Sequence, residues 1–184
     1  MNNTNYISEK SSKFLLEIIF ATQHYYTVSG ADLTDNYVDK LLVDTDGSLL
    51  LCATPSDVLS LISKESSFFD NETLQEWSRQ VTGIKTAYAV IDLDILLKDA
   101  FDPESYESVY YTLGVVKDYA LQLNDEKLLA IFERDILKQF IDDLADYFTW
   151  SENDLLKISV EINILLLSLK EIYERLKQCI HIYQ

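Results

Sequence analysis

Residues 43–51, VDTDGSLLL, contain two aspartates and a glycine at a spacing that resembles part of a calcium loop. An EF-hand loop needs its glycine at position six and oxygen ligands at positions one, three, five and twelve. With the glycine at six, Asp44 and Asp46 take positions three and five, but Leu42 falls at one and Ala53 at twelve. Neither of those side chains coordinates calcium. Asp-Gly between two apolar runs is also a strong hairpin signal, so we predict a hairpin turn and no metal site.

Residue types that support other chemistries are scarce. The two histidines, His24 and His181, are too few for a His-rich metal site, and neither is near a cysteine in the sequence. We expect His24 on an edge strand and His181 at the frayed end of the last helix. The four glycines are scattered, so they cannot build a phosphate-binding loop, and no nucleophile elbow or zinc-protease motif is present. The sequence predicts no cofactor.

Paired carboxylates are the remaining candidates for catalysis, and three pairs stand close in sequence: Asp92 with Asp94, Asp142 with Asp143, and Glu152 with Asp154. A metal-dependent hydrolase uses such pairs. A hydrolase is therefore the third function that we consider, after the two binding functions described below. However, neighbours one or two apart on a helix point in different directions. With 31 acidic residues in the chain, close pairs also arise by chance. We therefore expect a protein that is not an enzyme.

Charge is the strongest bulk signal. The chain has 31 acidic and 15 basic residues, which gives a formal net charge of −16, and both halves share the excess. A surface this negative repels nucleic acid and anionic lipid, and it attracts a basic protein. The alternative is that the acidity serves only solubility. We predict a basic protein partner, with no direct binding to nucleic acid or membrane.

One stretch, residues 139–156, combines acids with aromatics around a predicted helix–helix connection. Asp142 and Asp146 are four residues apart, so they share a helical face. Carboxylates beside aromatic anchors suit the Arg and Lys side chains of a basic partner. The alternative is a solvated connection whose tryptophan is tucked into the core. The candidate partner-binding residues are Asp142, Asp143, Asp146, Tyr147, Trp150, Glu152 and Asp154.

The first part of the chain reads as strands with short helices. Residues 12–22 fit a strand or a helix, and we favour a strand because the segment runs into β-branched and aromatic residues. Thr54 and Asp57 form a capping box that begins a short helix, and Asn71 is the predicted cap of a second. Residues 86–93 read as another strand.

The chain becomes helical from Asp102 onward, with apolar residues at helical spacing. We predict three long helices over residues 102–123, 124–148 and 151–180, the last capped by Ser151. The predicted class is α+β, with an N-terminal antiparallel sheet, an Asp-Gly hairpin and short helices packed on a C-terminal bundle of three long helices. The chain is then one domain with a sheet-rich part, residues 1–101, and a helical part, residues 102–184.

Several features indicate a cytoplasmic protein. Cys52 and Cys179 lie inside apolar stretches, which favours buried free thiols in a reducing compartment. The apolar runs fall far short of the ~20 residues of a membrane span. The N-terminus lacks the apolar core of a signal peptide.

The segments KFLLEIIFAT, YVDKLLVDTDGSLLLCATPSDVLSLI and AYAVIDLDILL together resemble, in order and texture, small acidic immunity proteins of bacterial polymorphic-toxin and contact-dependent growth inhibition systems. The resemblance covers about the first half of the chain and implies a cytoplasmic protein that blocks a basic, nuclease-type toxin domain. Some such proteins lend a sheet edge to the toxin, so residues 14–20 or 24–29 become candidate edge strands. A second hypothesis is an acidic DNA mimic or regulator that binds a nucleic-acid-binding protein.

Overall fold

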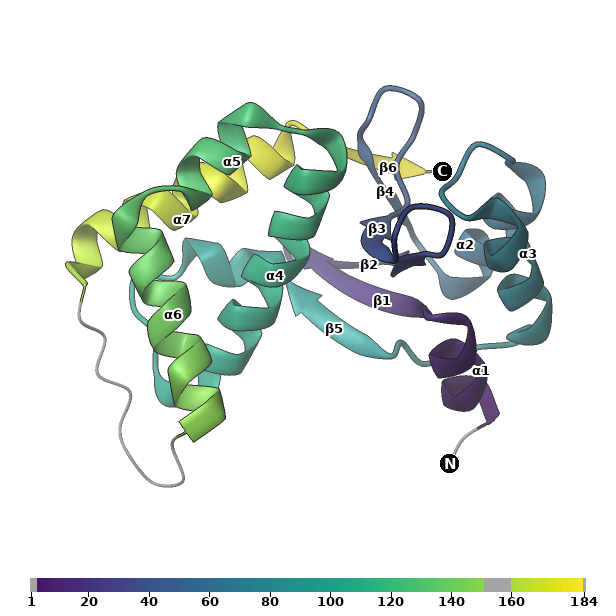
Figure 1. The fold of residues 1–184 in the computed structure, drawn as a ribbon, viewed down its shortest axis with the longest axis horizontal. Helices are drawn as coiled ribbons and strands as arrows, with labels where there is room; N and C mark the ends of the chain where they lie inside the picture. The colour runs from purple at the N-terminus through teal and green to yellow at the C-terminus, as the bar shows by residue number, and fades with distance from the viewer. Residues whose placement is uncertain (1–2, 151–159, 184) are drawn as a thin grey trace. The chain divides into compact units, whose positions relative to one another are not determined.

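The computed structural model describes residues 3–150 and 160–183, and the chain divides into two compact units (Figure 1). The first unit is residues 1–91 with 179–184, and the second is residues 92–178. The predicted α+β class is confirmed, because a mostly antiparallel six-stranded sheet is built mainly by the N-terminal half and the long helices follow it. The helical part is predicted to begin at residue 102, but the second unit begins at Asp92. The short helical segment after Ile91 already belongs to this unit.

The first unit combines the sheet with three helices. Its elements are α1 (Asn3–Ser11), β1 (Lys13–Phe20), β2 (Gln23–Asp32), β3 (Val38–Leu41), β4 (Leu49–Cys52), α2 (Pro55–Lys64), α3 (Asn71–Gln80), β5 (Ala89–Asp92) and β6 (Ile180–Tyr183). The strand order is β5-β1-β2-β4-β6, with β3 also paired to β2. Figure 1 shows α2 and α3 side by side within this unit.

Residues 12–22 are confirmed as mainly strand. β1 and β2 form an antiparallel hairpin in which Lys13 is opposite Gly30 and Phe20 is opposite Gln23. Ala21 and Thr22 connect the strands with φ angles of 50° and 61°. Two successive left-handed residues give a turn whose twist matches that of the flanking strands.

The expected edge strands are wrong. Residues 14–20 lie in β1, between β5 and β2, and residues 24–29 lie in β2, between β1 and β4. Their backbone groups are used inside the sheet because each strand has partners on both sides. His24 is therefore on an interior strand, near the β1–β2 turn, where its Nδ1 lies 2.6 Å from Oε1 of Glu17.

The predicted turn in residues 43–51 is present, but the predicted hairpin is reduced to a single bridge, because β3 pairs with β2 and β4 pairs with β2 and β6. Oδ1 of Asp44 accepts hydrogen bonds from the backbone N–H groups of Asp46 and Ser48, and Gly47 has a φ of 82°. An antiparallel bridge between Val43 and Leu49 closes the turn. The aspartate thus serves the backbone of its own turn, as Asx residues commonly do.

One of the two predicted helix N-caps in this unit is correct, and the other is wrong. Thr54 is the N-cap of α2, as predicted, because its hydroxyl oxygen accepts a hydrogen bond from the N–H of Asp57. The Asp57 carboxylate accepts from the Thr54 hydroxyl and not from the Thr54 backbone N–H, so the reciprocal bond of the predicted capping box is missing. The predicted cap at Asn71 is wrong, because α3 begins one residue earlier, with Asp70 at the N-cap position. Asp70 does not cap the helix with its side chain, since its carboxylate is used by a lysine.

That lysine is Lys13, whose side chain is fully buried. Its Nζ donates to Oδ2 of Asp70 at 2.7 Å and to the carbonyl of Ala31 at 2.5 Å, and it lies 5.5 Å from the centre of the Phe69 ring. The Asp70 side chain is only 4% exposed. The pair joins the start of β1, the end of β2 and the start of α3.

Apolar side chains from the sheet, α2 and α3 form the core of the first unit: Leu15, Val28, Leu42, Leu50, Cys52, Val58, Leu61, Ile62, Phe68, Leu74, Trp77 and Val81. Cys52 is a buried free thiol, as predicted, and burial raises its pKa to about 12. It is therefore protonated and unreactive at neutral pH. Cys179 is outside any disulfide in the described part of the chain and is only half-buried.

The second unit is helical. It contains the 3-10 segments η1 (Leu93–Leu97) and η2 (Pro103–Ser105), followed by α4 (Tyr106–Leu123), α5 (Glu126–Phe132), α6 (Asp135–Trp150) and α7 (Ile162–Lys177). Asp102 and Ser105 form a capping box at η2, so the predicted start is correct. No helix in the described ranges is long and apolar enough to cross a membrane.

The single helix predicted over residues 124–148 is wrong, because the chain breaks it into α5 and α6 at Glu133 and Arg134. Arg134 lies at the break: its guanidinium donates to the Ser168 hydroxyl at 3.2 Å and pairs with Glu171, both on α7. The turn therefore contacts α7. Phe132 and Leu137, on either side of the turn, are both buried.

The predicted last helix over residues 151–180 is also wrong in its extent. Residues 151–159, with the predicted cap Ser151, lie outside the described residues, and α7 begins only at Ile162. At the other end α7 stops at Lys177, and residues Ile180–Tyr183 form β6, parallel to β4. His181 is therefore on a strand and not at a helix end. Ile180 and Tyr183 are half-buried there, which explains the change of structure.

The buried pair predicts a large loss of stability when only one partner is removed. We expect Lys13→Met to lower the free energy of unfolding by about 3–5 kcal/mol, because Asp70 would keep an unpaired buried charge. Urea titration followed by tryptophan fluorescence measures this change, since Trp77 is buried in the same unit.

Two variants control for side effects of the substitution. Lys10→Met makes the same change at an exposed position of α1 and should be nearly neutral. Lys13→Met combined with Asp70→Asn should recover part of the loss, because the charge is gone and asparagine tolerates the left-handed backbone of residue 70. Equal stability of Lys13→Met and Lys10→Met would contradict a stabilising role for the pair.

Candidate functional site

The predicted partner-binding residues centre on α6, in the second unit. Asp142 and Asp146 are exposed, whereas Leu137, Phe140 and Leu144 on the opposite side of the helix are fully buried. The four-residue spacing therefore gives a shared outward face, as predicted. Within the described part of the chain, no lysine or arginine pairs with either carboxylate.

Asp143 and Tyr147 are placed differently from these two acids. Asp143 is half-buried and accepts a hydrogen bond at 2.8 Å from Nε2 of Gln139, one turn earlier. Tyr147 is half-buried, with its ring 5.9 Å from that of Tyr106 on α4 and 5.3 Å from that of Phe148. The structure therefore brings Asp142 and Asp146 together on the surface and turns Tyr147 toward α4.

Three predicted residues lie at or beyond the end of the described helix. Trp150 is the last residue of α6, and its side chain is outside the described part of the structure, as are Glu152 and Asp154. Their place in the candidate site stays a prediction.

An aromatic row that the sequence analysis did not assemble runs between α4 and α6. Phe148 contacts Tyr147 on its own helix and Tyr110 on α4, and the Tyr110 ring lies 5.9 Å from that of Tyr111. Phe148 is 44% exposed and Tyr111 is 55% exposed. The repeated aromatics in YESVYY and DYF were the available signal, but their pairing depends on how the two helices pack.

An open groove lies beside this row. Tyr110, Tyr111 and Gly114 of α4 and Ile141 of α6 contribute to its walls, and its volume is about 340 Å³. A Cβ atom at Gly114 would have no neighbour within 4 Å, so the space beside this residue is open. Because glycine has no side chain, it leaves this space to the groove. α6 thus has exposed acids on its outer face. Its flank joins a mainly apolar, aromatic groove that is also lined by Lys117 and Asp118.

The carboxylate pair at the start of this unit has structural roles. The Tyr173 hydroxyl donates to Asp94 at 3.1 Å, and the Thr112 hydroxyl donates to the backbone carbonyl of Asp92. Burial, with the nearby charge of Asp94, raises the pKa of the Asp92 carboxyl. These contacts join η1 to α4 and α7, whereas Oδ1 of the Asp92 carboxylate is buried and has no hydrogen-bond partner among the described residues.

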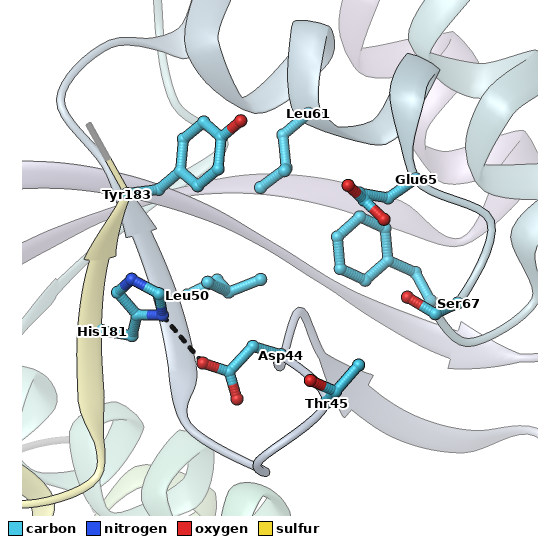
Figure 2. A pocket seen from close by; sticks show the side chains of 9 residues that line it. Asp44, Thr45, Leu50, Leu61, Glu65, Ser67, His181 and Tyr183 are labelled. Carbon is cyan, nitrogen blue, oxygen red and sulfur yellow. Dashed lines mark hydrogen bonds and ion pairs between the residues drawn. The ribbon is translucent and has the colours of Figure 1, made fainter.

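A second polar site, which we call the Asp44 pocket, lies in the first unit (Figure 2). Its apolar floor is formed by Leu50, Leu61 and Phe68, and its volume is about 190 Å³. Its polar rim comes from the 43–48 turn, the end of α2 and β6: Asp44, Thr45, Glu65, Ser67, His181 and Tyr183. Figure 2 shows Leu50 and Leu61 pointing into the space between these polar groups.

The Asp44–His181 pair is the best-defined contact of the pocket. His181 Nδ1 lies 2.8 Å from Asp44 Oδ2, and Asp44 is mostly buried. Burial alone would raise the pKa of the Asp44 carboxyl, but the hydrogen bonds from His181 and from the backbone of Ser48 and Asp46 outweigh it and lower the pKa below 3.8. An acceptor-only carboxylate implies that Nδ1 of His181 carries the proton.

Comparisons with known proteins support the fold. No protein-family model matches the chain, and no curated protein sequence matches it. The SatS C-terminal domain, whose crystal structure was determined in complex with bromine, is similar in structure with a TM-score of 0.64. The match covers 96% of both chains at 10% sequence identity, so it shows a shared fold alone.

The lowered pKa of Asp44 predicts a pH-dependent contribution to stability. A depressed folded-state pKa stabilises the fold above the unfolded value of 3.8 and loses that effect as pH falls through the folded pKa. We expect Asp44→Asn to destabilise the chain by about 1 kcal/mol at neutral pH, because His181 is half exposed and water screens part of the pair. The difference from the wild type should shrink as pH falls below about 4.

Urea titrations of both proteins across this pH range measure the effect. Including His181→Gln and the double variant gives a cycle that isolates the pair from the turn contacts of Asp44. A difference that does not change with pH would show that the Asp44 charge makes no contribution.

Proposed function

We propose that this chain is a cytoplasmic, non-catalytic protein that binds a basic cognate protein and, as an immunity protein, blocks a nuclease-type toxin domain. The observation that carries the proposal is the exposed Asp142–Asp146 face of α6, on a chain with a net charge of −16. The toxin assignment rests on the resemblance of the N-terminal segments to immunity proteins.

The Asp142–Asp146 face would act first on the association of a partner. The two carboxylates face water, without a lysine or arginine partner in the described ranges, so their field extends outward. Such a field steers a basic protein and raises its association rate, and it weakens with added salt. A negative net charge alone would serve solubility. Two carboxylates without a basic partner on one helix face also concentrate the negative field at one place on the surface.

The surface beside the acids offers aromatic contacts. Phe148 and Tyr111 are exposed members of the aromatic row, and the groove next to them is open. Large aromatic side chains commonly supply the strongest contacts in protein interfaces, and acidic residues around them act at the rim. α6 and α4 therefore offer both parts of an interface for a basic partner.

Inhibition in this proposal needs no reaction. The bound acidic protein would cover the toxin's substrate-binding face and replace the phosphates that basic side chains normally contact.

The partner is identified first. The purified chain is immobilised and offered a lysate in which the flanking reading frames are co-expressed, at moderate salt. We expect one basic protein, encoded beside this chain, to bind in stoichiometric amount and to lose its toxicity. Capture of many unrelated DNA-binding proteins would instead support the DNA-mimic hypothesis.

The binding face is tested with Asp142→Lys combined with Asp146→Lys. We expect the association rate with that partner to fall at least about tenfold at low salt, because the steering field is reversed, and the difference to shrink at high salt. Stopped-flow fluorescence measures the rates, and thermal unfolding should be almost unchanged.

The matched control is Glu72→Lys with Glu76→Lys on α3. These residues are exposed, are also four apart and change the net charge by the same amount, but they lie in the first unit. An equal effect of both double variants would show that only total charge matters, and the α6 face would then lose its role.

A further inference from the structure

The Asp44 pocket is too small for a nucleotide or a cofactor. Its volume is about 190 Å³, whereas pockets for drug-sized ligands hold roughly 300–1,000 Å³. It is large enough for one short chain of atoms with a polar end. The ligand size is therefore that of a single amino-acid side chain or a small amine.

The rim of the pocket selects the charge of such a ligand. Two carboxylates, Asp44 and Glu65, line it, and neither lysine nor arginine does. In a neutral His181 whose Nδ1 proton is directed to Asp44, the other ring nitrogen is an acceptor. Hydroxyl groups of Ser67 and Tyr183 can accept as well. A donor-rich cation complements this rim, and an anion would be repelled.

Glu65 is the carboxylate that is free to pair with such a ligand. It follows α2 as the C-cap residue, where its backbone N–H is bonded to Leu61, and its side chain is exposed. Within the described ranges no basic side chain pairs with it. Asp44, by contrast, is already held by His181 and by its own turn.

The floor selects the shape of the ligand. Leu50, Leu61 and Phe68 are buried side chains that leave an apolar surface between the polar groups, as Figure 2 shows for Leu50 and Leu61. Lysine and arginine place an aliphatic stem on such a surface and keep the charged head at the polar rim. The aromatic rings of Phe68 and Tyr183 also favour a cation nearby.

We infer that the Asp44 pocket binds an organic monocation, a primary ammonium or a guanidinium on a short aliphatic stem. Glu65 pairs with the charge, His181 and the hydroxyls accept its remaining hydrogen bonds, and the floor packs against the stem. This site is in the first unit and needs no contribution from α6, so it stands apart from the proposed binding face. The ligand is either a free amine or an Arg or Lys side chain of a polypeptide.

The test is an NMR titration of the isotope-labelled full chain with N-acetyl-arginine amide. Its neutral isostere, N-acetyl-citrulline amide, is the matched control ligand. We expect saturable shifts of the Leu50 and Leu61 methyl groups and of His181, with a dissociation constant on the order of millimolar for so small a ligand. Citrulline amide should bind at least about tenfold more weakly. Equal binding of the two, or shifts confined to other residues, would overturn the inference.

Variants at Glu65 test its assigned role without disturbing the Asp44–His181 pair. Glu65→Gln should weaken arginine-amide binding several-fold, and Glu65→Lys should abolish it because the new ammonium competes for the same rim. Glu9→Gln, an equal charge change at an exposed position of α1, should leave binding unchanged. Identical binding by the Glu65 and Glu9 variants would contradict a pocket that uses Glu65.

Two further ligands separate the sources of the cation. Binding of n-butylammonium as tight as that of a pentapeptide with a central arginine indicates a site for free amines. At least tenfold tighter binding of the peptide indicates a side chain presented by a polypeptide, and both results support the inferred chemistry. None of these readouts uses the toxin, so failure here is distinct from failure of the proposed function.

Discussion

The buried ion pair between Lys13 and Asp70 is the constraint on which the first unit depends. Removing two charges from water is costly, so the pair is tolerated only if its remaining donors and acceptors are satisfied. The lysine also donates to the Ala31 carbonyl, and the Phe69 ring lies beside its charge. Three segments far apart in sequence must therefore meet at one point. Gly30 shows how closely they meet, because a Cβ atom there would lie 2.1 Å from the carbonyl oxygen of Ser12.

The same constraint shapes the Asp44 pocket. Asp70 begins α3, and the short segment that leads to it from the end of α2 contains Phe68, a buried floor residue of the pocket. Fixing Asp70 therefore fixes where this segment crosses the edge of the core. The opposite side of the pocket depends on β6, which joins β4 by parallel pairing and contacts the turn through His181. The pocket thus needs two long-range contacts, one that places α3 and one that places the last strand.

Features of this fold that depend on neighbouring residues were predictable from the sequence, and features that depend on distant ones were not. The N-cap at Thr54 and the turn at Asp44 were predicted because each forms its hydrogen bonds within a few residues. The break between α5 and α6 was missed because Arg134 finds its partners on α7. The candidate site divides in the same way. Helical spacing was enough to place Asp142 and Asp146 on one face, but Asp44 and His181 are 137 residues apart, and no local pattern indicates that they meet.

The negative charges of the two candidate surfaces act over different distances. One acidic chain can therefore carry both surfaces. The carboxylates of α6 are exposed, so they act through a field that salt screens over about 8 Å at physiological ionic strength. Such charges govern how fast a partner arrives more than how long it stays. Asp44 is mostly buried beside an apolar floor, where screening is weaker and hydrogen-bond geometry matters more. Recognition there is selective for the shape and the donors of one cationic group. Each surface therefore makes its own demand on a ligand: a net positive charge for the first, and one donor-rich cationic group on an apolar stem for the second.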